Sequence, residues 1–159
     1  RFDSVKSFEN FPHITILRPF NFDENQEDLL IEKFSGINLK WYFNLFLNTT
    51  RKIDYAVENV QSNSFAVVNK SDFAMPLDVL VEYNDGSKEL FYIPLREMRG
   101  EKPAENLVEY KGVKRTVLTD AFWTNPVYEV KTSKAVKQIT IDPTKRLADV
   151  DYTNNVFTK

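Results

Sequence analysis

The segment over residues 38–57 constrains the fold of this chain most, because a helix that is apolar on nearly every side runs directly into an alternating β-strand. The predicted helix carries seven large apolar side chains: Leu39, Trp41, Tyr42, Phe43, Leu45, Phe46 and Leu47. A helix with so few polar positions normally lies between two layers of structure. We therefore expect a second layer over this helix, and interpret the chain as part of a larger protein whose function it shares.

Five side chains of this helix are the predicted interface residues: Trp41, Tyr42, Phe43, Phe46 and Leu47. They circle the helix, so a neighbouring sheet can cover only some of them, and each large side chain left in water forfeits about 1.5–3 kcal/mol of available burial. We expect the helical part to self-associate or to bind an absent domain. In a monomer, Trp41 or Phe46 is expected to be the most exposed large apolar residue.

From Ile53 onward the apolar period changes from helical to two, which indicates half-buried strands. Strands are predicted over residues 53–57, 65–68, 77–83, 89–93, 113–118, 127–131 and 136–141. Residues 84–87 tolerate positive φ and predict a hairpin. The pattern predicts a mainly β fold, an immunoglobulin-like or fibronectin-like antiparallel sandwich of about seven strands over residues 52–159. Within it, Val79 and Val81 should face inward, whereas Asp78 and Glu82 should be solvated and tolerate alanine.

Residues 1–51 are predicted to form an N-terminal helical segment, the end of an upstream domain. Asp23 or Asn25 is placed to cap a first helix that Gly36 ends, and Asn38 to cap the second. The irregular approach before these helices has one short regular run, over residues 14–17.

Composition and charge exclude several classes of function. The 21 basic and 23 acidic residues give a net charge of −2 without basic runs, so nucleic acid is not an expected partner. Cysteine is absent, which excludes disulfides, thiolate metal sites and cysteine nucleophiles and leaves the compartment undetermined. No apolar run reaches the roughly 18–20 residues of a membrane span.

The chemical inventory indicates a chain that is not itself an enzyme. His13 is the single histidine, so no site with two histidine ligands can form, and we assign no catalytic, cofactor-binding or metal-binding residue. One acidic segment remains open as a calcium site, with oxygen ligands from Asp142, Asp149, Asp151, Asn154 and Asn155. It lacks the glycine and glutamate of a calcium loop, and capping of turns explains the same residues.

Four aromatic residues suggest a rival function, a free-standing carbohydrate-binding or protein-binding module. Tyr110, Phe122, Trp123 and Tyr128 are candidates for a platform on which sugars stack. Phe122 and Trp123 are adjacent, however, and on a strand they would point to opposite faces.

A series of short motifs runs in order along the chain, over residues 34–36, 39–43, 48–50, 53–57, 75–79, 83–87, 98–100, 125–128, 141–143 and 147–151. This series resembles the C-terminal region of bacterial zinc aminopeptidases of the aminopeptidase N superfamily. The resemblance implies a non-catalytic part that braces or shapes the peptidase, with the upstream catalytic domain of the same chain as its partner. It also implies that zinc and its ligands belong to that upstream domain, because none of them maps here.

Overall fold

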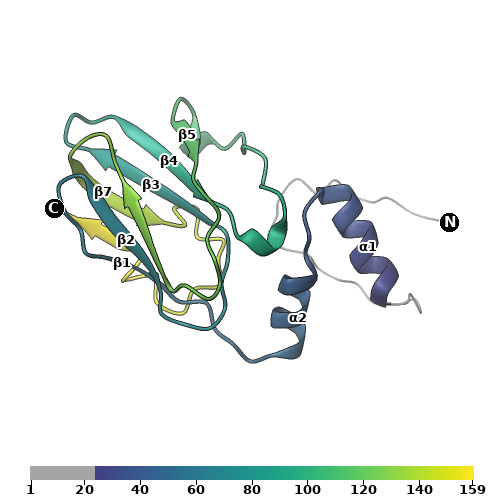
Figure 1. Cartoon of the computed structure of the whole chain (residues 1–159). Coiled ribbons are helices and arrows are strands. Elements are labelled where there is room, and N and C mark those ends of the chain that lie inside the picture. Colours follow the sequence, from purple (N-terminus) through teal and green to yellow (C-terminus); the bar gives the residue numbers. More distant parts are fainter. Residues whose placement is uncertain (1–23) are drawn as a thin grey trace.

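The computed structural model describes residues 24–159, which form two helices and a body of two sheets. The helices are α1 (Glu24–Ser35) and α2 (Lys40–Asn48), and both lie to one side of the sheets, with α1 farther from them than α2 (Figure 1). His13 and the predicted run over residues 14–17 lie outside the described residues.

Within residues 24–159, eight strands form the two sheets, which confirms a mainly β, sandwich-like fold. The first sheet has the order β1-β2-β6, with β1 (Tyr55–Glu58), β2 (Ser64–Asn69) and β6 (Val127–Lys131). The second has the order β5-β4-β3-β7-β8, with β3 (Leu77–Tyr83), β4 (Lys88–Ile93), β5 (Lys114–Val117), β7 (Val136–Ile141) and β8 (Val156–Thr158).

One strand pair departs from the predicted antiparallel arrangement. β5 runs parallel to β4, with Glu89 opposite Lys114 and Tyr92 opposite Val117. The long connection over residues 94–113 explains this difference, because a parallel neighbour requires a crossover of about a dozen residues or more. The other strand pairs are antiparallel.

The predicted hairpin is confirmed between β3 and β4. Leu77 pairs with Ile93 and Glu82 with Lys88, so the register is continuous along both strands. Gly86 has a φ of +80° in the turn, a left-handed conformation that glycine adopts without a steric penalty.

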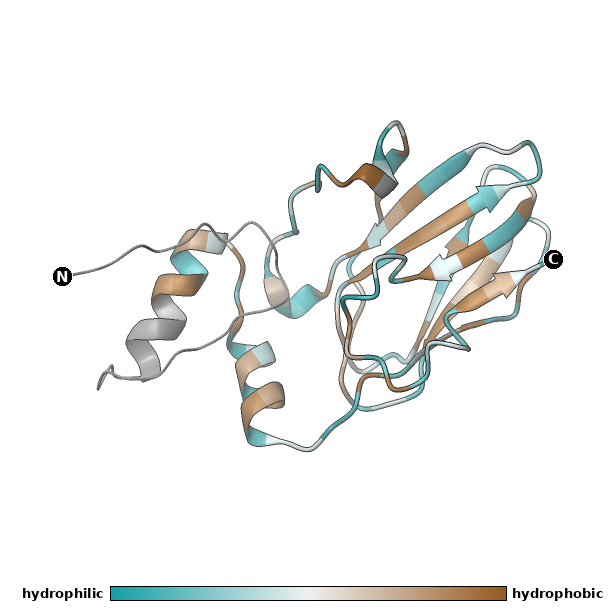
Figure 2. Ribbon diagram, turned by 180° about the vertical axis from the view of Figure 1, so that it is seen from behind, coloured by the Kyte–Doolittle hydropathy of each residue, from teal (hydrophilic) through white to brown (hydrophobic). Residues whose placement is uncertain are grey.

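The core lies between the sheets and follows the alternation of β3. Val79 and Val81 are completely buried, as predicted, and every second residue from Leu77 to Tyr83 is buried with them. β7 contributes Ile139 and Ile141 to the same cluster. Along the strands, brown stretches occur together with teal ones (Figure 2).

The outer face of β4 is also buried, because the connection over residues 94–113 covers it. Two short 3-10 turns, η1 (Arg96–Met98) and η2 (Val108–Tyr110), lie in this connection. The Tyr92 hydroxyl accepts a hydrogen bond from Lys102 N at 3.1 Å, and the Arg115 guanidinium lies 4.6 Å from the centre of the Tyr92 ring. The connection therefore forms a partial third layer.

This layer corrects the expectation for Asp78. Its side chain does face away from the core but is only 9% exposed, and Lys102 Nζ donates to its Oδ2 at 2.6 Å. The outer face is closed here by a loop that an alternating pattern does not reveal. Glu82, on the same face, forms ion pairs with Lys88 and Lys137.

The C-terminal end of α1 agrees with the predicted signal, but Asn25 lies inside α1 and Asp23 lies outside the described residues. Gly36 has a φ of +70° and its N–H donates to Glu32 O at 2.8 Å, which ends α1. The N-cap residue of α2 is Leu39 rather than the predicted Asn38, and it makes no side-chain cap hydrogen bond. Asn38 Oδ1 nevertheless accepts from Lys40 N at 3.2 Å, and Glu32 Oε1 accepts from Leu39 N at 2.8 Å and Lys40 N at 3.1 Å, so both side chains satisfy N–H groups where the helix begins.

The segment between the helices is attached to the β body. Asn38 N donates to Met98 O at 2.7 Å, and Ile37 and Trp41 pack against a small cluster of Ala74, Leu95 and Met98. The domain boundary between residues 51 and 52 stays a prediction.

Candidate functional site

Helix α2 has one side on the body of the protein. Trp41, Tyr42 and Leu45 are half-buried against the main core, and the rings of Tyr42 and Phe73 have centroids 6.2 Å apart. The Trp41 indole Nε1 donates to Asn38 O at 2.8 Å, which satisfies its polar group. Burial raises the pKa of the Tyr42 hydroxyl above its ordinary value.

Two large side chains of α2 face solvent. Phe46 is 55% exposed and Leu47 is 59% exposed. We call this pair the free side of α2. The Phe46 ring stacks on Tyr42 with centroids 5.4 Å apart and planes 12° apart, so the exposed ring continues a stack that reaches the core. Brown residues run along α2 in Figure 2.

The predicted interface set is therefore divided. Phe43 is buried, while Trp41 and Tyr42 are half-buried, so these three residues do not offer the open surface expected of them. Trp41 is also not among the exposed large apolar residues, and Val108 is more exposed than Phe46. When apolar side chains lie on all sides of a helix, the sequence does not reveal which side the β body covers.

A second surface lies in the turn between β5 and β6. Phe122 and Trp123 are 48% and 61% exposed, and Asn125 N donates to Phe122 O at 3.0 Å, which closes the turn. The expectation that the two side chains point to opposite faces of a strand does not apply, because both residues lie in a turn. Tyr110 is buried, so the four aromatic residues do not form one platform.

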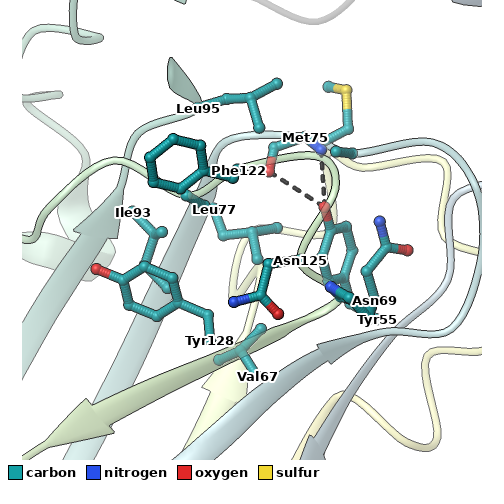
Figure 3. A pocket seen from close by; sticks show the side chains of 13 residues that line it. Tyr55, Val67, Asn69, Met75, Leu77, Ile93, Leu95, Phe122, Asn125 and Tyr128 are labelled. Carbon is teal, nitrogen blue, oxygen red and sulfur yellow. Dashed lines mark hydrogen bonds between the residues drawn. The ribbon is translucent and has the colours of Figure 1, made fainter. Parts of the chain in front are cut away.

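Two spaces adjoin this turn. A cavity of about 20 Å³ between the sheets has room for about one water molecule, and Tyr55 donates to and accepts from the backbone of Met75 beside it (Figure 3). Outside it lies an open hollow of about 510 Å³. Both spaces are lined by Ala121, Phe122, Asn125 and Tyr128.

The acidic segment over residues 142–155 has the turn-forming role that the capping interpretation predicts. Asp142 Oδ2 accepts from Leu147 N at 2.6 Å, and Asp149 Oδ1 accepts from Asp151 N at 2.9 Å. Asp151 Oδ1 accepts from Thr153 N at 3.0 Å. Across residues 24–159, no group of three or more His, Cys, Asp or Glu side chains is arranged to hold a metal ion.

Sequence reasoning missed a polar cluster on the outer face of the second sheet. Lys102 bridges Asp78 and Glu105, at 2.6 and 2.8 Å, and Arg146 pairs with Glu105. Burial alone would raise the pKa of Glu105, but hydrogen bonds from Arg146 and Lys102 lower it. These contacts between cations and carboxylates hold the connection in place. The loop and strands that build this cluster are distant in sequence, which leaves no local signal.

Glu89 is a second missed residue, a carboxylate buried at the junction of β4 and β5. It accepts hydrogen bonds from Tyr83 and Lys114, each at 2.8 Å, and from Thr116. Burial favours a raised pKa, but these hydrogen bonds outweigh it and lower the pKa of Glu89.

Comparison with protein-family models, curated proteins and solved structures found no match. In the described part of the chain, no helix is long and apolar enough to cross a bilayer.

Proposed function

We propose that this chain is a non-catalytic β-sandwich module that docks an adjacent domain onto the free side of α2. The observation that carries the proposal is the exposure of Phe46 and Leu47 on a helix whose other side is held by the protein's own core. Burying the two side chains against a neighbour would contribute about 1.5–3 kcal/mol each.

The chemistry of α2 favours an apolar partner surface. Lys40 is its single charged residue, and no acidic residue lies in the first turn and no basic residue in the last. Charge steering therefore contributes little, and shape and apolar burial determine the contact. A neighbouring domain of the same polypeptide suits such a contact, because covalent linkage supplies a high effective concentration without electrostatic attraction.

The motif resemblance favours a zinc aminopeptidase as the whole protein and its catalytic domain as the neighbour. This identification has a direct test in the coding region upstream of Arg1. We expect a His-Glu-x-x-His motif there, which places two zinc ligands on one helix face. An upstream reading frame without such a motif contradicts the aminopeptidase identification but leaves the docking proposal standing.

Docking through α2 is tested on the chain itself by sedimentation velocity and by binding of a hydrophobic dye. With no partner present, the wild type should self-associate as its concentration rises, and Phe46→Ser with Leu47→Ser should abolish this. Val108→Ser is the matched control, because Val108 is exposed but lies in the 94–113 connection. A wild type that stays monomeric and binds no dye would refute a docking role for this side.

The non-catalytic part of the proposal has its own test. Protein purified without chelator should contain no stoichiometric zinc and should not hydrolyse aminoacyl amides. Chelator-sensitive turnover would overturn it.

A further inference from the structure

We infer that the hollow between the 119–125 segment and β6 binds a neutral saccharide, with the Phe122 ring as its stacking surface. The hollow has a volume of about 510 Å³, within the roughly 300–1,000 Å³ typical of small-molecule sites. This inference does not depend on the proposed docking role of α2, which lies in another part of the chain.

The polar groups around the hollow can form hydrogen bonds with the hydroxyl groups of a sugar. Asp120 and Glu129 line it, and within residues 24–159 neither carboxylate has a hydrogen-bond or ion-pair partner. Asn125 Oδ1 accepts from Val127 N at 3.2 Å, which orients the amide and leaves Nδ2 as a donor. Carboxylates accept hydrogen bonds from sugar hydroxyls, and an amide N–H₂ donates to them.

The aromatic part of the hollow is held in place before any ligand arrives. The Arg96 guanidinium lies 5.0 Å from the centre of the Phe122 ring, while the Phe122 residue as a whole is 48% exposed. Ala121 N donates to Pro94 O at 2.8 Å, which anchors the turn to the second sheet. A fixed ring with an open face suits the C–H groups of a pyranose, because these groups carry the positive charge that the ring face attracts.

The charge of the lining selects the ligand class. No lysine or arginine lines the hollow, whereas two carboxylates do, so anionic ligands such as phosphates or nucleotides are disfavoured. The Tyr128 hydroxyl already donates to Thr119 O at 2.7 Å, so its proton is not available to a ligand and the side chain forms a rigid wall of the hollow. A neutral polyol with an apolar face uses both the free polar groups and the ring.

The test is isothermal titration of the chain with five neutral hexasaccharides: cellohexaose, xylohexaose, mannohexaose, maltohexaose and chitohexaose. At least one should bind with a dissociation constant below about 5 mM. Phe122→Ala should weaken this binding about tenfold or more, because the stacking surface is lost. Val108→Ala, with an exposed side chain that does not line the hollow, should bind like the wild type.

A second variant and the salt dependence of binding test the same conclusion independently. Glu129→Gln keeps the side-chain shape on an exposed strand position and should also weaken binding, which covers the case in which Phe122→Ala unfolds. Binding of a neutral sugar should not change between low and high salt. The inference is overturned if no hexasaccharide binds, if binding survives both substitutions, or if spermidine alone binds in a salt-sensitive manner.

Discussion

Replacement of Asp78 by alanine is the sharpest test of the third layer over β4. Asp78 occupies a strand position that alternation assigns to solvent, yet Lys102 Nζ lies 2.6 Å from its Oδ2 and Arg146 Nη2 lies 4.0 Å away. The substitution removes the charge that attaches the 94–113 connection to the sheet and leaves both cations partly buried.

The size of the effect follows from these contacts. A hydrogen bond between charged groups contributes about 1.5–3 kcal/mol to stability. Lys102 keeps Glu105 as a second partner at 2.8 Å, so we expect the free energy of unfolding to fall by about 1–2 kcal/mol, around the lower end of that range. In a chain of this length, 1 kcal/mol corresponds to about 2–4 °C, so Tm should fall by roughly 2–8 °C.

Equilibrium unfolding in urea, followed by far-UV circular dichroism, measures this change. Glu82→Ala is the matched control, because Glu82 lies on the same strand and face but outside the cover of the connection, and it should unfold at nearly the wild-type denaturant concentration. Asp78→Asn, which keeps the shape of the side chain, should fall between wild type and Asp78→Ala. If Asp78→Ala and Glu82→Ala are equally harmless, the connection is not held to the sheet by this charge.

Three further outcomes are expected. Val79→Ala should lower the free energy of unfolding in urea by about 1–3 kcal/mol, because the site is fully buried, whereas the half-exposed Val127→Ala should change it little. Glu89→Gln should be less stable than wild type at pH 7, and since the fold lowers the pKa of Glu89, thermal melts should show the difference narrowing as the pH falls below about 4.3. Tyr55→Phe should cost about 1–2 kcal/mol by leaving Met75 N unpaired. Burial raises the pKa of Tyr55 to about 12. The stability difference between the wild type and Tyr55→Phe should therefore shrink in thermal melts as the pH rises from about 10 to about 12, because only the wild type has this hydroxyl.

The β body was predictable where buried apolar residues of a strand alternate with polar residues on its outer face. The alternation around Val79 and Val81 fixed the inward side of β3, and the turn with Gly86 fixed its partner. β8 escaped prediction because three residues carry no measurable period. The run from Ile53 begins as an isolated bridge to Asp149, so β1 starts only at Tyr55.

The candidate sites were harder to predict, since exposure depends on contacts between distant segments. The apolarity of α2 correctly pointed to uncovered side chains, and Phe46 and Leu47 are exposed, but Phe43 is buried. The covered side includes Tyr42, whose ring lies against Phe73 from a later segment of the chain. The hollow beside Phe122 depends on the turn that Asn125 closes, and this turn lies between two predicted strands, where the sequence pattern carried no signal for a hollow.

The bonds between β1 and the 149–155 segment have a consequence for the rate at which this protein folds. Tyr55 N donates to Asp149 Oδ2 and Val57 N donates to Asn154 O, each at 3.0 Å, and the first joins residues 94 positions apart. Closing so large a loop costs chain entropy before any of these contacts compensates for it. We expect slow, topology-limited folding, in which the free edge of β1 stays unpaired until the 149–155 segment binds to it. During synthesis that edge stays open to pairing with other chains for as long as residues 149–155 remain inside the ribosome.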